Sequence, residues 1–500
     1  MQAPGTEPGP PMRGTYRNAL ALAAGCAAIL SFAPFDFLPA GIVAFALLVH
    51  LWLGAPTPRA AFWSGWWFGL GLFGAGVSWV YVSLHEFGAM PALVAGIATL
   101  GFCAFLALFP ALAGWLQARW RVAEWLRGAL VIPALWTFFE WLRGWVLSGF
   151  PWLSAGYAAP GWPLEGYAPL GGTYLASLAM LACAGFLRQS VAGPRRGAAA
   201  LALATLFALG AALRAVEWTE PRRSVAVALL QGNVPQALKF DAGRYADTLA
   251  TYERLAAGSH ARLIVLPETA LPRFLDDIDP AYLRRLEAIA RRNHGNLLLG
   301  VPTREPSGRY YNSVLSLGTS PSQRYHKVHL VPFGEFVPPG FGWVQSMLSI
   351  PLSGFSAGSR DQPPLDLAGE RVAVNVCYED AFGEEIIRQL PRATLLVNVS
   401  NVAWFGDSLA PAQHLQIARM RALETGRTML TATNSGITAA IDRDGRVIAR
   451  LPQYTEARLE VAARSYAGAT PYTRVGDLGA LAAIALMLGA PLLAQVLRKR

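Results

Sequence analysis

Long apolar runs fill the first 220 residues and return near the C-terminus. A helix that spans a bilayer needs about 20 mostly apolar residues, and eight runs approach that length. They cover roughly residues 18–33, 38–54, 60–83, 89–115, 125–147, 168–187, 197–214 and 476–497. Prolines fall at or near several of the gaps, where a helix can end. The pattern predicts a polytopic α-helical membrane domain with eight transmembrane helices.

Between about residue 224 and residue 466, short apolar runs alternate with stretches of helical spacing. Seven runs are typical of buried strands that end in polar or turn residues: SVAVALLQGN, ARLIVLPET, GNLLLGVP, YNSVLSLG, RVAVNVCYED, ATLLVNVSN and TMLTATNSG. Strands that alternate with helices predict an α/β domain in which helices cover a sheet. We therefore expect a membrane domain at 1–220, an α/β domain at 221–468, and an eighth helix with a short tail at 469–500.

Composition agrees with this division. Of the 500 residues, 53% are hydrophobic and 15% are charged, whereas a soluble domain usually carries about 25% charged residues. A wholly soluble chain is therefore excluded, and four cysteines cannot form a disulfide scaffold. Much of the net charge of +10 lies in loops between the apolar runs, so we expect no nucleic-acid partner.

The basic residues also predict the orientation in the membrane. If the N-terminus is cytoplasmic, the inner segments hold twelve basic residues, and the short outer loops hold essentially Arg143 alone. The positive-inside rule then puts both termini in the cytoplasm and the α/β domain in the periplasm. A cleaved signal peptide is disfavoured because the first apolar run has no clear cleavage site. A lipoprotein cleavage box ending at Cys26 is a weaker alternative, since its apolar lead is short.

Three residues at the ends of predicted strands carry candidate chemistry. Cys377 is the one cysteine outside the apolar runs, and it lies where a strand turns toward a helix, a position that favours a thiolate. Lys327 is one of only three lysines in a chain with 39 arginines, and a compact ammonium can stabilise an oxyanion. Glu268 follows a strand and could accept a thiol proton.

Each of these residues also has a plainer interpretation. A free cysteine is often a small buried hydrophobe, three lysines could be chance, and a glutamate after a strand is often a surface or capping residue. Cys–His catalysis competes as well, because His326, His329 and His414 are available. Two histidines at i and i+3 without a third ligand are a weak zinc signal, so no metal is expected.

The segments around the three residues resemble a known superfamily. Glu268, Lys327 and Cys377 stand in LPET, YHKVHLVPFGE and NVCYED, which are similar to the Glu-Lys-Cys triad motifs of the nitrilase superfamily. The resemblance implies a four-layer α-β-β-α sandwich. Longer segments, including QGNVPQALKF, YYNSVL and NVSNVAWFGDSLAPAQHLQIARMRALETGR, together with EWLRGW and GFPW, resemble the apolipoprotein N-acyltransferase family over nearly the whole chain.

The resemblance to that family implies a specific reaction. An acyl chain passes from a phospholipid, typically phosphatidylethanolamine, through a cysteine thioester to the α-amino group of the diacylglyceryl-cysteine that begins a bacterial lipoprotein. It implies Cys377 as nucleophile, Glu268 as general base and Lys327 as oxyanion stabiliser, without a cofactor. A monomer in the bacterial inner membrane is expected. Further residues that match family positions in or beside the pocket are Glu335, Glu379, Tyr378, Asn312 and Phe240, where the family has Trp in place of the phenylalanine.

Residues 336–355 are unusually apolar for a loop of a domain in water. Side chains such as Phe336, Phe341 and Trp343 would favour aggregation if simply exposed. One interpretation is a covered core segment. The other is a mobile lid that enters the outer leaflet and contacts the lipid substrate.

Two competing functions share parts of this pattern. A membrane-tethered amidase of the nitrilase type would use the same triad, but it has no need of seven preceding helices. A transporter or scaffold with an inactive nitrilase-like module would be expected to have lost a triad residue, and Glu268, Lys327 and Cys377 are all present.

Overall fold

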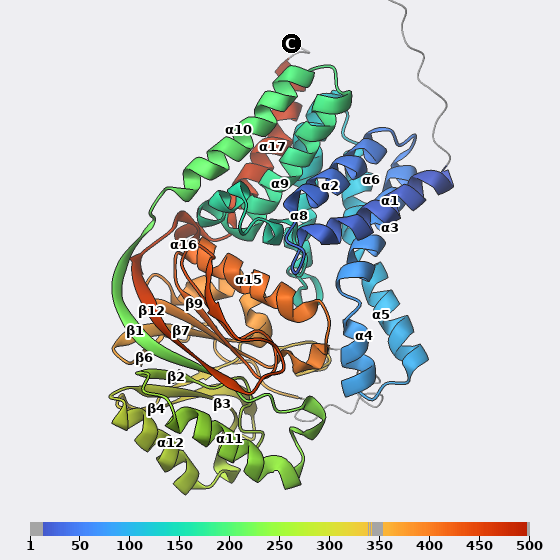
Figure 1. Ribbon diagram of the computed structural model, residues 1–500. Helices are drawn as coiled ribbons and strands as arrows, with labels where there is room; N and C mark the ends of the chain where they lie inside the picture. Colours follow the sequence, from blue (N-terminus) through green and yellow to red (C-terminus); the bar gives the residue numbers. More distant parts are fainter. Residues whose placement is uncertain (1–13, 339, 341, 343–353, 498–500) are drawn as a thin grey trace, which may run out of the picture.

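The computed structural model describes residues 14–338, 340, 342 and 354–497, and comprises a helical part and a part built on two sheets (Figure 1). Each of the eight apolar runs contains a helix. The helices of this part are α1 (Gly14–Ala28), α2 (Leu38–Leu53), α3 (Pro58–Gly76), α4 (Val80–Val82), α5 (Ala92–Leu106), α6 (Leu108–Gln117), α7 (Glu124–Leu126), α8 (Ile132–Arg143), α9 (Ala168–Ala192), α10 (Arg196–Arg214), α16 (Pro471–Val475) and α17 (Leu478–Leu497).

Three helical stretches in the described chain are long and apolar enough to cross a membrane: Ala92–Gln117, Pro163–Ala192 and Arg196–Arg214. A fourth is possible if Pro58–Gly76 and Val80–Phe87, which meet at an angle of 58°, form one span. Leu38–Leu53 and Leu478–Pro491 are apolar but shorter. The expected count of eight spans is therefore met only in part, because turns of 3-10 or π type interrupt several of the runs.

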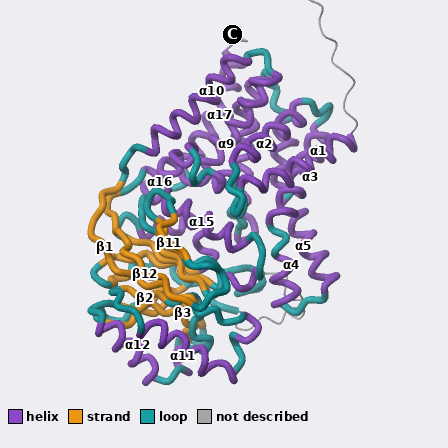
Figure 2. Tube along the Cα trace, viewed as in Figure 1, coloured by secondary structure: helices purple, strands orange, loops and turns teal. Residues whose placement is uncertain are grey.

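The second part contains two six-stranded sheets that lie face to face (Figure 2). The first sheet has the order β12 (Ala457–Gly468), β1 (Thr219–Gln231), β2 (Leu263–Val265), β3 (Asn296–Arg304), β4 (Tyr310–Gly318) and β5 (Arg324–His326). The second has the order β11 (Val447–Arg450), β10 (Ala439–Ile441), β9 (Met429–Thr433), β8 (Leu395–Ser400), β7 (Glu370–Val376) and β6 (Leu365–Leu367). All seven predicted strands are present.

Apolar side chains hold the layers together. Val227, Val265, Val374 and Val397 belong to a fully buried cluster between the two sheets, because alternate residues of each strand point toward the facing sheet. Helices α11 (Tyr245–Ala257) and α12 (Pro280–Arg292) cover the outer face of the first sheet. Helices α14 (Gly383–Ile386) and α15 (Ala410–Thr425) cover the outer face of the second sheet. The result is the four-layer α-β-β-α sandwich expected from the sequence.

Local signals explain where these helices begin and end. Asp279 precedes α12, and its side chain accepts a hydrogen bond from the Ala281 amide at 2.8 Å, an arrangement typical of an N-cap. Pro280 takes the first helical position, where no amide donor is needed. Gly426 ends α15 with a φ of 64°, a left-handed conformation that glycine adopts without strain.

Helix α15 joins the two parts of the molecule. It is buried on nearly all sides, because one face packs on the second sheet and the other on the helical part (Figure 1). The Gln413 side-chain oxygen accepts hydrogen bonds from the indoles of Trp79 at 3.1 Å and Trp152 at 2.7 Å. Gln416 donates to Asp36 at 3.0 Å. These glutamines satisfy buried polar groups across the joint, which positions the sandwich against the apolar helices.

Candidate active site

Three strand ends converge at one end of the sandwich. Glu268 follows β2 and Lys327 follows β5, both in the first sheet, whereas Cys377 directly follows β7 in the second. The side chain of Lys327 is 1% exposed, and its ammonium is close enough to Glu268 and Cys377 for their charges to interact. The structure therefore brings the three predicted residues together although they come from different sheets.

Glu268 and Lys327 belong to a dense network of hydrogen bonds. The Lys327 Nζ lies 3.4 Å from Glu268 Oε1 and 2.9 Å from Glu335 Oε2. The Asn312 amide donates to Glu268 at 2.7 Å and to Glu335 at 2.8 Å, and the Asn401 backbone amide donates to Glu268 Oε2 at 2.9 Å. One ammonium and one amide thus hold the buried Glu268 carboxylate and the half-buried Glu335 carboxylate side by side.

The electrostatics of this network keep Glu268 ionised and Lys327 protonated. Burial disfavours a charged Glu268, but Lys327, the Asn312 amide and Lys239 outweigh it, so the pKa of Glu268 lies below its ordinary value. Burial likewise opposes a charged Lys327, but Glu335 and Glu268 raise its pKa above the ordinary value. The pair therefore offers a base beside a fixed positive charge.

Cys377 occupies a strained turn. Its φ is 53°, which is uncommon for a residue other than glycine and is typical of nucleophiles at a strand-to-helix turn. Burial and the nearby Glu268 carboxylate raise the pKa of the thiol to about 12, against the opposing effect of Lys327. The sequence favoured a thiolate here, and that expectation is wrong because Cys377 is only 9% exposed. The thiol must lose its proton during the reaction, which requires a neighbouring base.

Glu379 ties the cysteine turn to the lysine loop. Its carboxylate accepts hydrogen bonds from the backbone amides of Val376 at 2.6 Å, Val328 at 2.6 Å and His329 at 3.1 Å, and from the Tyr325 hydroxyl at 3.1 Å. Val376 precedes Cys377 and Val328 follows Lys327. Glu379 therefore sets the distance between the nucleophile and the ammonium, which makes it a positioning residue.

Replacing Glu379 by Gln is expected to lower the free energy of unfolding by about 1–3 kcal/mol, because an amide NH₂ would face backbone N–H donors. Burial raises the pKa of Glu379 from 4.5 to about 7. The wild type therefore loses stability as the pH rises from 4.5 toward 7, and the variant does not. The deficit should be largest near pH 5, as measured by thermal unfolding in detergent. Glu287→Gln, which removes only an exposed pair with Arg291, is the control, and an equal deficit in both variants would contradict this role.

Tyr378 connects the site to the helical part. Its hydroxyl donates to the Gly149 carbonyl at 2.9 Å, and its ring stacks near Phe150 and Trp152, with centroids 6.4 Å away in each case. Arg143 supports this wall by donating to the Phe150 carbonyl at 2.5 Å and the Trp152 carbonyl at 2.6 Å. An aromatic wall, formed by Tyr378, Phe150 and Trp152, therefore extends from the cysteine turn to the end of the apolar helices.

The structure describes only some of the residues expected in the lid or against the substrate. Phe240 is half-buried, and its neighbour Lys239 reaches the site. Phe336 is half-buried, and its carbonyl accepts a hydrogen bond from the Phe333 amide at 2.7 Å. Phe341 and Trp343 lie outside the described residues, so the lid stays a prediction.

Sequence reasoning missed two residues beside the triad. One is Lys239, for which the scarcity of lysine was as strong a signal as it was for Lys327. The other is Asp380, whose Oδ2 lies 3.1 Å from His414 Nε2. His414 was a candidate for Cys–His catalysis, and its Nε2 lies 3.4 Å from the backbone carbonyl oxygen of Cys377. Within the ranges that the structure describes, no group of three or more His, Cys, Asp or Glu is arranged to hold a metal.

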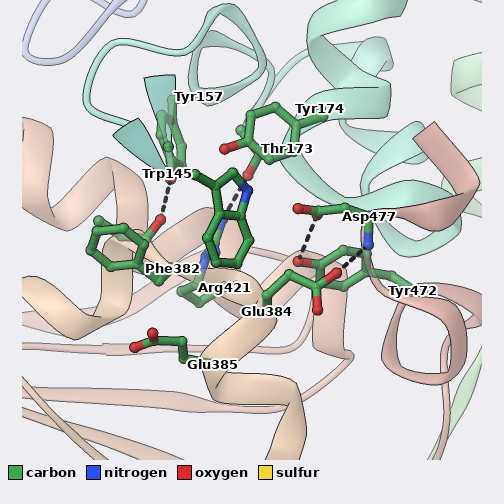
Figure 3. A pocket seen from close by; sticks show the side chains of 13 residues that line it. Trp145, Tyr157, Thr173, Tyr174, Phe382, Glu384, Glu385, Arg421, Tyr472 and Asp477 are labelled. Atoms are coloured by element: carbon green, nitrogen blue, oxygen red, sulfur yellow. Dashed lines mark hydrogen bonds between the residues drawn. The ribbon is translucent and has the colours of Figure 1, made fainter. Parts of the chain in front are cut away.

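A small cavity of about 20 Å³ lies behind the site, where the sandwich meets the apolar helices (Figure 3). Arg421 of α15 donates to the Thr173 hydroxyl at 2.6 Å and pairs with Glu424 at 3.1 Å. The Tyr157 hydroxyl donates to the Ala381 carbonyl at 3.1 Å. None of the triad residues lines this cavity, so it belongs to the joint between the two parts and not to the reaction site.

Known protein families match both parts of the chain. Residues 24–186 match the family model described as the apolipoprotein N-acyltransferase N-terminal domain, and residues 226–472 match the carbon-nitrogen hydrolase model. A curated relative named apolipoprotein N-acyltransferase, from Nitrosomonas europaea, is 49% identical over 95% of this chain and 97% of its own. Relatives with that name from Chromobacterium violaceum and Ralstonia nicotianae are 46% and 43% identical, and cover 96% and 97% of this chain and 95% and 94% of their own.

Proposed function

This chain belongs to the apolipoprotein N-acyltransferase family, and from that premise we propose that Glu268, Lys327 and Cys377 carry out the acyl transfer. The protein is an acyltransferase of the nitrilase superfamily. The observation that carries the proposal is the Lys327 ammonium, buried between Glu268 and Glu335 beside the strained Cys377 turn. Acyl transfer through a covalent intermediate needs a base, a fixed positive charge and a thiol, and this buried site contains all three.

In the first half-reaction, Cys377 attacks an ester carbonyl of a phospholipid. The thiol proton passes to the Glu268 carboxylate as the C–S bond forms, and Lys327 stabilises the negative charge on the carbonyl oxygen. The tetrahedral intermediate then breaks its C–O bond. The leaving alkoxide takes the proton from Glu268, so a lysophospholipid departs and a thioester remains on Cys377.

In the second half-reaction, the neutral α-amino group of a lipoprotein's diacylglyceryl-cysteine attacks the thioester carbonyl. Glu268 accepts a proton from the nitrogen, the C–S bond breaks, and the proton returns to the Cys377 sulfur. The products are an amide and the free thiol. Both half-reactions therefore use one base and one oxyanion site, which is the logic of a ping-pong mechanism.

We infer that both substrates reach the site from a membrane. The helical part carries large apolar side chains on its surface, including Leu93, Ile97 and Leu100 on α5 and Leu201 on α10, which are 60–76% exposed. Such surface is unfavourable in water and favourable against lipid. The aromatic wall from Phe150 to Tyr378 joins this surface to Cys377, and acyl chains can follow it.

The remaining features of the proposal concern the whole molecule. We propose eight transmembrane helices in the bacterial inner membrane, both termini in the cytoplasm, and the catalytic domain at about 221–468 in the periplasm. The basic residues of the loops support this orientation. Phosphatidylethanolamine is the proposed donor and the protein is proposed to act as a monomer. The amidase alternative is disfavoured, because relatives that cover nearly the whole chain are named as acyltransferases.

The test is to incubate the purified protein in detergent with phosphatidylethanolamine that carries an isotopically labelled acyl chain. Mass spectrometry of the peptide that contains Cys377 is expected to show the labelled acyl group as a thioester. Adding a diacylglyceryl-cysteine peptide should discharge the label onto its α-amino group. No label on Cys377, together with ammonia release from small amides, would overturn the proposal in favour of an amidase.

A further inference from the structure

Lys239 lies in the site although no strand end delivers it. It follows the 3-10 turn Gln236–Leu238, after β1 has ended at Gln231. Its side chain is buried, with 3% exposed, and its Nζ donates a hydrogen bond to the backbone carbonyl oxygen of Glu268 at 3.2 Å. A second ammonium therefore reaches the base from the side of β1.

This ammonium differs from that of Lys327 in one respect. Lys327 pairs with two carboxylates, Glu268 and Glu335, whereas no ion pair within 4.0 Å involves Lys239 in the part of the chain that the structure describes. A buried ammonium without a carboxylate in direct contact is unfavourable, because desolvation is not repaid by a close opposite charge. Groups of this kind are concentrated at functional sites.

The charges of the site indicate what Lys239 contributes. In the resting site, Lys239 and Lys327 are positive, Glu268 and Glu335 are negative, and Cys377 is a neutral thiol. When the thiol proton moves to Glu268, the negative charge moves from that carboxylate to the sulfur, and the total over these five groups stays zero. Without Lys239, the other four groups would hold one excess negative charge both before and after the proton moves.

On the basis of the proposed acyl transfer, we propose that Lys239 is a positioning residue whose buried positive charge keeps Glu268 ionised, and therefore able to accept the Cys377 proton. It acts through Glu268 and touches neither the thiol nor the oxyanion site in this structure.

The electrostatics of the site agree with this role. Burial lowers the pKa of Lys239 from 10.5 to about 8, and the charges of Glu268 and Cys377 oppose the decrease. Burial raises the pKa of Glu268, whereas Lys327, the Asn312 amide and, to a smaller extent, Lys239 lower it. The titratable groups that surround Glu268 or its partners are Lys239, Lys327, Cys377, Glu335, Glu379 and His414.

The experiment follows the acylation of Cys377 in a single turnover with labelled phosphatidylethanolamine, from pH 3 to pH 9, in the full-length protein, because the pKa of Glu268 lies below its ordinary value. In Lys239→Met, the acidic limb of the rate profile is expected to move up by about one pH unit, since Glu268 loses a nearby positive charge. Near neutral pH the rate should change little, because Glu268 stays ionised there in both proteins. Lys239→Arg, which keeps the charge, should leave the limb in place.

Two further variants serve as controls. Lys239→Gln is a second neutral variant in case the first does not fold, and Leu238→Met tests the same turn without a change of charge. An acidic limb that stays in place in both neutral variants, or that shifts equally in Lys239→Arg, would overturn the role of the charge. If wild-type Cys377 is not acylated, the proposed acyl transfer itself is contradicted. An acylated wild type whose acidic limb does not depend on the charge at residue 239 contradicts only the role of Lys239.

Stability supplies an independent readout. Because the pKa of Lys239 lies below the ordinary 10.5, the folded protein binds fewer protons than the unfolded chain between pH 8 and 10.5, and its stability rises with pH in that window. Lys239→Met removes the buried charge, so its Tm at pH 7 should equal or exceed that of the wild type, while its acylation on the acidic limb is slower. A lower Tm with an unchanged acidic limb would assign Lys239 a structural role instead.

Discussion

Replacing Cys377 by Ala is expected to abolish acyl transfer, with no labelled acyl group on the protein and a fall of at least about 10³-fold in product. The thiol is the nucleophile of the proposed mechanism, whereas Glu268 and Glu335 are held by Lys327 and Asn312. The fold should persist, since the substitution removes a single buried sulfur and leaves the backbone conformation to the surrounding hydrogen bonds. Mass spectrometry and thermal unfolding in detergent measure the two effects.

The matched control is Cys183→Ala, which removes a buried thiol from α9, far along the chain from the catalytic domain. Its acyl transfer should be close to that of the wild type. Cys377→Ser is informative as well, because a hydroxyl is a weaker nucleophile in the same place. Full transfer by Cys377→Ala would contradict the covalent mechanism and would point to direct attack by the amine on the phospholipid.

Replacing Lys327 by Met is expected to reduce acylation of Cys377 by about 10³-fold, because the oxyanion loses its positive partner. It should also lower the free energy of unfolding by about 3–5 kcal/mol, since the buried Glu268 and the half-buried Glu335 lose the ammonium between them. Carboxylates raise the pKa of Lys327 above 10.5. Its stabilising effect is therefore fully present below pH 10.5 and is lost only above it, so the deficit persists at neutral pH.

Single-turnover acylation and thermal unfolding at pH 6, 7 and 8 measure the two consequences. The double variant Lys327→Met with Glu335→Gln separates them, because it removes one of the stranded carboxylates. Stability should return in part, whereas acylation should not. Acylation within tenfold of the wild type in Lys327→Met would contradict the oxyanion role, and the site would then have to use Lys239 or backbone amides instead.

Several parts of the site are visible in the sequence because their signals are local. A run of buried residues followed by polar ones marks a strand end within about ten positions, and Glu268, Lys327 and Cys377 each follow such a run. The scarcity of lysine singled out Lys327, and the same signal applied to Lys239. That signal alone could not place Lys239 in the site, because the segment around Lys239 has no regular strand or helix pattern to indicate where its side chain lies.

The protonation of the site could not be predicted, because it depends on burial. A strand-to-helix turn with a nearby cation is a local pattern that favours a thiolate. The structure instead surrounds Cys377 with two packed sheets and the Glu268 carboxylate, which raises its pKa. Desolvation is a property of the whole environment of a side chain, and residues more than 100 positions away along the chain create it.

The sequence by itself determined the apolar helices, the succession of the main strands along the chain and, through the resemblance, the four-layer arrangement, and it singled out Glu268, Lys327 and Cys377 as candidates. Tertiary structure alone decided that Glu268 and Lys327 from one sheet meet Cys377 from the other. It also decided that Glu379 fixes the distance between two loops, and that α15 is buried between the sandwich and the helices. Periodicity and turn signals act over neighbouring residues, whereas the apposition of sheets is set by packing between distant segments, which no local pattern records.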